Sequence, residues 1–243
     1  MSVETRNVQK ERGVPGSARF HDERKLIMNI SQYIQPKEAT HIPEPPIAKF
    51  LFADTRMAWF WLIVRLYVGY EWLTAGLDKL TGYSFTFDSS FGTKVGNPWV
   101  FGAHDGAAMA GFAKGAMALS TGQHPAVQGW YASFLQSVVV PNATVFAYMV
   151  TFGEVLVGLG LIFGVLTGIA AFFGVFMNLN FMLAGAVSIN PVIGMLALLL
   201  VLAWRVAGYY GVDSVLLPLL GTPWTGRLVG KKAMVKAPAT ATN

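Results

Sequence analysis

The chain has no cysteine among its 243 residues. It therefore forms no disulfide, holds no iron–sulfur cluster through its own thiolates and has no thiolate nucleophile. Histidine is also scarce, and all four, His21, His41, His104 and His124, lie outside the long apolar runs. This distribution argues against a haem held by paired histidines and against a histidine-rich zinc site. We expect no metal site within the chain, so any electrons it handles must pass through an organic cofactor or a partner subunit.

Charged side chains are scarce as well. They make up 13% of the chain, whereas 53% is hydrophobic and the mean hydropathy is +0.47. A soluble domain carries charge on about a quarter of its residues, so this composition predicts a multi-pass membrane protein. Four apolar runs each approach the ~20 residues that cross a bilayer as a helix; they cover residues 57–80, 142–166, 167–189 and 191–211. The predicted fold is all-α, a bundle of four transmembrane helices.

Lysine and arginine are distributed unevenly along the chain. They are frequent before the first apolar run and after the last, whereas residues 81–141 contain only Lys94 and Lys114. The positive-inside rule therefore predicts that both termini are cytoplasmic and that residues 81–141 lie outside. We expect three parts: a tail over residues 1–55 that is largely disordered or forms a surface helix, a membrane domain over 56–220, and a second tail over 221–243. The net charge of +5 then reflects topology and contact with membrane lipid, not nucleic-acid binding.

The outer segment shows helical periodicity. Between Ala126 and Val140 the apolar residues recur at the spacing of an amphipathic helix. A second helix is predicted from Pro98 to about Leu119, with Asn97 as its N-cap. These two extracytoplasmic helices either shape a site or only cover hydrophobic surface of the bundle.

The first apolar run carries four ionisable residues, which are Arg65, Glu71, Asp78 and Lys79. A charge that faces lipid costs a few kcal/mol, so these side chains must face protein or water. Counting depth at ~1.5 Å per residue places Arg65 level with Glu154 of the second run, which predicts a buried ion pair. Glu71 and Asp78 are seven residues apart and share one helix face, while Asn178 and Asn180 come to mid-membrane near Glu71.

Three segments of the chain carry a family resemblance. They are RLYVGYEWLTAGLDKLTG (65–82), GEVLVGLGLIFGVLTGIAAFFGVFMNLNFMLAGAVSINP (153–191) and GYYGVDSVLLP (208–218). Over residues 55–220 the sequence resembles the DoxX/DoxD family of small prokaryotic membrane proteins. The resemblance implies a four-helix bundle in the plasma membrane. It also implies a link to thiosulfate:quinone oxidoreductase, in which a DoxD subunit works with a DoxA subunit to oxidise thiosulfate to tetrathionate and to reduce membrane quinone. Other members are associated with detoxification or thiol-stress complexes.

The leading hypothesis is therefore a quinone-linked oxidoreductase subunit with thiosulfate as its electron donor. Reduction of a quinone requires hydrogen-bond donors at its carbonyl oxygens and two protons. The candidate residues are Glu71 and Asp78 for proton transfer, Trp72, Asn178 and Asn180 for the quinone, and Lys79, Lys94 and Lys114 for the thiosulfate anion. The chain has no evident two-electron relay, so the two substrates meet directly or a second subunit supplies the missing groups.

Two other interpretations stay open. In the first, the chain is a non-catalytic accessory or assembly subunit of a larger respiratory complex, and its buried charges, such as Arg65 and Glu154, only fix helix register. In that interpretation Lys79 sits near a span end and extends to lipid headgroups. The second is a transporter, which the absence of an evident inverted repeat disfavours. The aromatic face formed by Trp59, Phe60 and Trp61 makes a homo-oligomer plausible.

Overall fold

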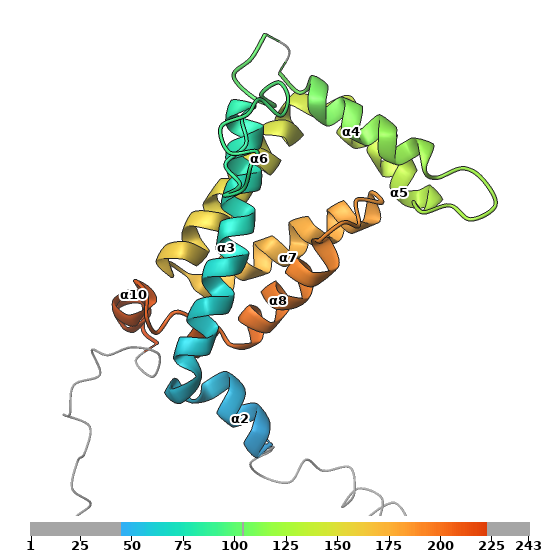
Figure 1. The fold of residues 1–243 in the computed structure, drawn as a ribbon. Coiled ribbons are helices and arrows are strands. Elements are labelled where there is room, and N and C mark those ends of the chain that lie inside the picture. Colours follow the sequence, from blue (N-terminus) through green and yellow to red (C-terminus); the bar gives the residue numbers. More distant parts are fainter. Residues whose placement is uncertain (1–44, 104, 223–243) are drawn as a thin grey trace, which may run out of the picture. The chain divides into compact units, whose positions relative to one another are not determined.

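A computed structural model describes residues 45–103 and 105–222 (Figure 1). These residues belong to a single compact unit that begins at Pro45. Residues 1–44 of the predicted first tail (1–55), residues 223–243 of the predicted second tail (221–243), and His104 lie outside the described residues.

The described residues form helices joined by loops, and the all-α prediction is confirmed. In chain order the α-helices are α2 (Pro46–Ala53), α3 (Ala58–Thr81), α4 (Ala107–Ala118), α5 (Gly129–Phe134), α6 (Ala143–Phe163), α7 (Thr167–Leu183), α8 (Asn190–Leu202), α9 (Trp204–Ala207) and α10 (Asp213–Leu219). A 3₁₀ turn (Thr55–Met57) precedes α3, and a π-helical turn (Leu135–Val139) continues α5. Within residues 45–103 and 105–222, extended pairing is limited to one bridge between Tyr83 and Lys94.

The four predicted spans correspond to α3, α6, α7 and the α8–α9 pair. The first two match closely, whereas α7 ends at Leu183 and α8 at Leu202, before the predicted ends of their spans. The chain turns after α7 at Gly185, which has a φ of 80°, a value that glycine adopts without strain. In the described part of the chain only α6 is both long and apolar enough to cross a membrane, and α7 and α8 are apolar but shorter.

The bundle is built around the antiparallel pair of α3 and α6, and α7 packs beside α8 as a second pair (Figure 1). Glycines allow α3 and α6 to approach closely. A Cβ atom on Gly158 would lie 2.6 Å from the backbone nitrogen of Leu73, and one on Gly76 would lie 2.8 Å from that of Val155. Since no side chain fits at such distances, these contacts set the register between the two helices.

The outer segment folds into α4 and the run of α5 and its π turn. The helix predicted over residues 126–140 is confirmed, but the predicted start of the other helix at Pro98 is wrong, because α4 begins at Ala107. The preceding loop is held by Asp105, whose carboxylate accepts hydrogen bonds from the Tyr148 hydroxyl (2.8 Å) and the Gly102 N–H (2.5 Å). The hydrogen bond from Tyr148, and to a smaller extent the one from Gly102, lowers the pKa of Asp105.

A second polar cluster fastens the opposite end of the bundle, where α6 turns into α7. The Asp213 carboxylate accepts the backbone N–H groups of Leu166 (2.6 Å) and Thr167 (2.7 Å). Arg65 donates to the carbonyl oxygens of Ala207 (3.1 Å) and Tyr210 (3.2 Å). We call these two residues and their backbone partners the Arg65–Asp213 clasp. It joins α3, the α6–α7 turn and the segment that follows α9.

Replacing Asp213 with asparagine tests the clasp. The amide nitrogen of Asn cannot accept an N–H, so one of the two bonds at the start of α7 is lost, and we expect about 1–3 kcal/mol of destabilisation. Thermal unfolding in detergent micelles measures this change. Asp88→Asn, on an exposed loop, serves as the control and should unfold at the wild-type temperature. Equal unfolding temperatures for the two variants would contradict the role of Asp213 in the clasp.

Candidate functional site

A polar chamber lies among α3, α6, the end of α7 and the start of α8. Its cavity volume is about 340 Å³, and its polar walls are Glu71, Lys79, Glu154 and Asn190. The aromatic rings of Trp72, Trp99, Phe112 and Phe181 also line it. This combination of charge and flat apolar surface occurs inside a bundle whose other buried side chains are mostly hydrophobic.

The central feature of the chamber is an ion pair between Lys79 and Glu154. The Lys79 Nζ atom lies 2.7 Å from Oε2 of Glu154, whose side chain is 1% exposed, against 19% for that of Lys79. Nζ also lies 5.3 Å from the centroid of the Trp99 ring and 5.9 Å from that of Phe181. Aromatic faces stabilise a cation at these distances, so the ammonium is held from three sides.

The predicted ion pair between Arg65 and Glu154 is wrong. Arg65 belongs to the clasp, where its guanidinium packs against Gly164 and Gly211, and Glu154 pairs with Lys79. The depth count assumed that α3 and α6 begin level with the two membrane edges. The glycine contacts instead shift the register by about ten residues, roughly 15 Å of helix, so that Gly76 of α3 faces Glu154 and Val155.

The two acidic residues proposed for proton transfer lie in different surroundings. Glu71 lines the polar chamber, and its carboxyl group interacts with the Tyr67 hydroxyl. Asp78 is not among the chamber-lining residues, and its carboxylate accepts the N–H of Phe85 at 2.9 Å. Asp78 therefore holds the turn that follows α3, and Glu71 is the candidate that faces open volume.

The three lysines proposed for the anion are not brought together in the chamber. Lys79 is engaged by Glu154 and lines the chamber instead of extending to headgroups. Lys94 lies in the loop after α3 and Lys114 on α4, both exposed and neither lining the chamber. The chamber therefore offers an anion at most one of the three ammonium groups.

The residues proposed for the quinone are also divided. Trp72 lines the chamber, and Asn178 is fully buried beside it, with its Nδ2 atom 3.3 Å from Oδ1 of Asn190. Among the described residues, Trp72 Nε1 and Asn178 Oδ1 are buried without a hydrogen-bond partner. Asn180 points to another cavity, where its Oδ1 atom accepts the Tyr131 hydroxyl at 3.2 Å.

Sequence reasoning missed the contribution of Asn190 to the chamber. Asn190 directly precedes the predicted last span, which begins at residue 191, and in the structure it is the first residue of α8. Its Nδ2 atom donates to the Ala186 carbonyl at 2.6 Å. The Asn-Pro pair was a usable signal, because it places an amide at a helix start close to the predicted depth of Glu71.

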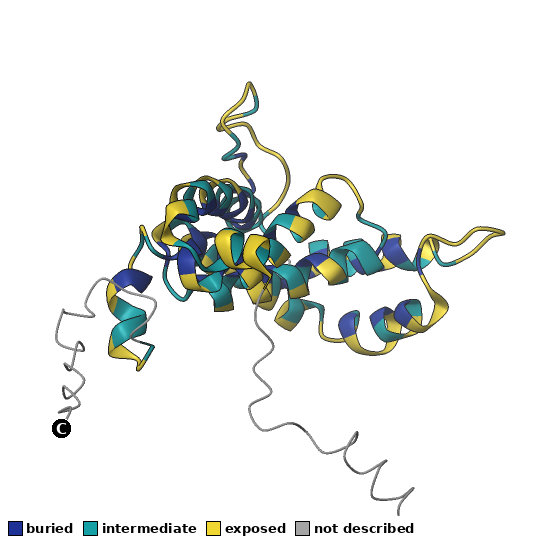
Figure 2. Ribbon diagram, turned by 90° about the horizontal axis from the view of Figure 1, so that it is seen from below, coloured by how far each residue is buried: buried dark blue, intermediate teal, exposed yellow. Residues whose placement is uncertain are grey.

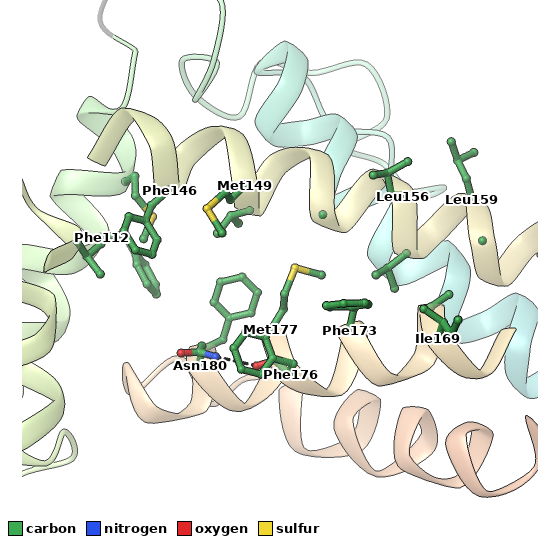
Figure 3. A pocket seen from close by; sticks show the side chains of 18 of the residues that line it. Phe112, Phe146, Met149, Leu156, Leu159, Ile169, Phe173, Phe176, Met177 and Asn180 are labelled. Carbon is green, nitrogen blue, oxygen red and sulfur yellow. Dashed lines mark hydrogen bonds between the residues drawn. The ribbon is translucent and has the colours of Figure 1, made fainter. Parts of the chain in front are cut away.

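An apolar groove of about 810 Å³ runs between α6 and α7 (Figure 3). One end of the groove lies under α4 and α5 and is lined by Phe112 and Tyr131. The rest of the groove is lined by apolar side chains of α6 and α7, among them Leu156, Leu159, Ile169 and Phe173. Phe112 and Phe181 line both this groove and the polar chamber. The two cavities are therefore neighbours with a shared aromatic wall.

A family model described as DoxX matches residues 60–189, which is more than half of the chain. The chain belongs to the DoxX family. DoxX proteins are membrane-associated, and membership indicates a redox-related role. The matched range contains every chamber-lining residue except Asn190 and Ile193. Comparisons with curated proteins and with solved structures found no match.

The Lys79–Glu154 ion pair predicts how substitutions in the chamber of this DoxX protein change its stability. Lys79→Met leaves a buried carboxylate unpaired and should destabilise the protein by about 3–5 kcal/mol. The double variant Lys79→Met/Glu154→Gln removes both charges and should recover most of that loss. Chemical unfolding in mixed micelles of the two single variants and the double variant gives the coupling energy. If the losses in unfolding free energy of the two single variants add up to that of the double variant, the pairing of Lys79 with Glu154 is contradicted.

Proposed function

We propose that this chain is an integral membrane subunit of a quinone-linked oxidoreductase, and that a quinone headgroup is reduced in the polar chamber. The observation that carries this proposal is the Lys79–Glu154 pair, set with Glu71 among four aromatic rings. A chamber of about 340 Å³ lies near the lower end of the ~300–1,000 Å³ range of small-molecule sites and suits one substituted ring.

The chamber residues match the requirements of quinone reduction. A quinone gains two electrons and two protons to become a quinol, and negative charge develops on its carbonyl oxygens. The Lys79 ammonium would stabilise that charge, and Glu71 would deliver the two protons one after the other, taking up a new proton between the two transfers. The faces of Trp72 and Trp99 provide apolar walls for a flat ring.

Four helical segments would hold the protein in the membrane. Many helix positions are exposed (Figure 2), and they include large apolar residues: Met149, Leu156, Phe172 and Met195 are each more than half exposed. Such a surface is typical of lipid contact. The 17 residues of α7 and 13 of α8 span about 25 and 20 Å, so these two would be tilted or would cross with help from their flanking turns.

Thiosulfate is the proposed electron donor. Two thiosulfate ions give one tetrathionate and two electrons, which is the number that one quinone accepts. The chain has no cysteine, and the described residues contain no cluster of three or more metal-ligating side chains. A second subunit is therefore proposed to bind the donor and to pass its electrons to the chamber.

One observation favours an accessory subunit as the second candidate. Arg65, Asp78 and Asp213 all bond to backbone groups and stabilise turns or helix ends. In an accessory subunit the Lys79–Glu154 pair would have the same structural purpose, and the chamber would hold no substrate.

The proposed topology, with both termini cytoplasmic, is tested by single cysteines, since the natural chain has none. Gln123→Cys lies in the loop between α4 and α5, and Thr55→Cys precedes α3; both positions are exposed. In spheroplasts a membrane-impermeant maleimide should label the first variant and should label the second only after lysis. The opposite pattern would invert the topology.

The proposed chemistry is tested by thiosulfate-dependent reduction of a soluble quinone, using protein purified with and without its co-purifying chains. We expect turnover in the complete preparation. Glu71→Gln should lower kcat by about 100-fold, the contribution typical of a general acid, without changing the unfolding temperature.

Tyr67→Phe is the matched control for that variant. It removes the hydroxyl that interacts with Glu71 but leaves the carboxyl group in the chamber, so its turnover should stay close to that of wild type. Absence of turnover in every preparation would favour the accessory role. Unchanged kcat in Glu71→Gln would remove Glu71 from the reaction.

A further inference from the structure

We propose that the apolar groove between α6 and α7 binds the hydrocarbon tail of the amphiphile whose headgroup enters the polar chamber. The ligand would then be a long-chain quinone that enters sideways from the bilayer. This inference rests on the proposed function, because the chamber defines the headgroup.

The groove offers almost no free polar group to a ligand. Its polar side chains, Tyr131 and Asn180, satisfy each other: the Tyr131 hydroxyl lies 3.0 Å from the Asn180 carbonyl oxygen and 3.2 Å from Oδ1. The Asn180 Nδ2 atom donates to the Phe176 carbonyl at 2.8 Å. Because a polar ligand would lose its own hydration without replacement bonds there, the groove suits hydrocarbon alone.

The groove adjoins the chamber at an aromatic pair that forms the wall between them. The rings of Phe112 and Phe181 line both cavities, with centroids 6.1 Å apart and planes at 89°. Passage of a tail from one cavity to the other would require these two rings to move apart, and no hydrogen bond of their side chains would be broken by that movement. Phe181 also faces Lys79 at 5.9 Å, which places the passage beside the charged pair.

The groove is open along its length toward the proposed lipid phase. Leu156 and Phe163 on α6, and Ile169, Phe173 and Phe176 on α7, line it and are each more than half exposed (Figure 3). A volume of about 810 Å³ exceeds that of the chamber more than twofold. A flexible chain lying between the two helices would cover these side chains while its head reached the ion pair.

The acyl chain of a phospholipid has the same chemistry as a quinone tail, and the test separates the two. Full-length protein in nanodiscs is titrated with a quinone that lacks a tail and with its decyl analogue, at matched mole fractions in the lipid. Quenching of tryptophan fluorescence reports binding. We expect the decyl analogue to bind at least about tenfold more tightly, because its tail is buried.

Ile169→Trp fills the groove, and Leu198→Trp is its matched control. Leu198 is an equally lipid-exposed residue on α8 that does not line the groove. Ile169→Trp should lose most of the advantage of the decyl analogue and should bind the tail-less quinone as wild type does, whereas Leu198→Trp should keep both affinities. Leu159→Trp, another groove residue, repeats the test if the first variant does not fold.

The outcomes distinguish the two proposals. No binding of either analogue by wild type would overturn the quinone function and this inference with it. If wild type binds the tail-less quinone, and the affinity gained from the decyl tail is the same in Ile169→Trp and Leu198→Trp, the tail site alone is overturned. Farnesol, which has an isoprenoid chain but no quinone ring, should compete with the decyl analogue. If added phosphatidylcholine abolishes the tail advantage, the groove is a lipid site and the inference fails.

Discussion

The ion pair between Lys79 and Glu154 is the contact on which the arrangement of the chamber depends. Glu154 is almost completely withdrawn from solvent, and a carboxylate in such surroundings needs a cation close by. The pair joins α3 to α6 at the level where Gly76 and Gly158 bring the two backbones together. In that register Glu71 and Trp72 face the chamber, and Arg65 is brought to the α6–α7 turn.

The two charged clusters of the bundle differ in the space around them. In the Arg65–Asp213 clasp, backbone carbonyl and N–H groups surround both charges, and Gly164 and Gly211 leave no room for even a methyl group. The Lys79–Glu154 pair instead borders an open cavity with aromatic walls. Both clusters bury charge, and the adjoining cavity is what distinguishes the Lys79–Glu154 pair as the candidate site.

The arrangement of the cavities is consistent with an amphiphilic substrate. A small polar chamber and a larger apolar groove meet at Phe112 and Phe181, so α3 and α8 would contact the head alone, whereas α6 and α7 would contact both head and tail. The chain supplies charge, proton-bearing groups and apolar walls but no thiol. These groups suit the binding and protonation of a quinone, and for that reason we propose that a partner subunit binds the electron donor.

Composition and periodicity were sufficient to predict an all-helical chain, the positions of α3 and α6, the outer amphipathic helix and the importance of charges in the first apolar run. Those features are local, because each follows from the hydrophobic pattern of one segment. The separation of Asn178 from Asn180 is also local, because two residues that are two positions apart on one helix point to nearly opposite sides of it. The pairing of Glu154 with Lys79 instead of Arg65 was not predictable. It depends on the offset between α3 and α6, which the glycine contacts of the folded bundle determine and which no single segment encodes.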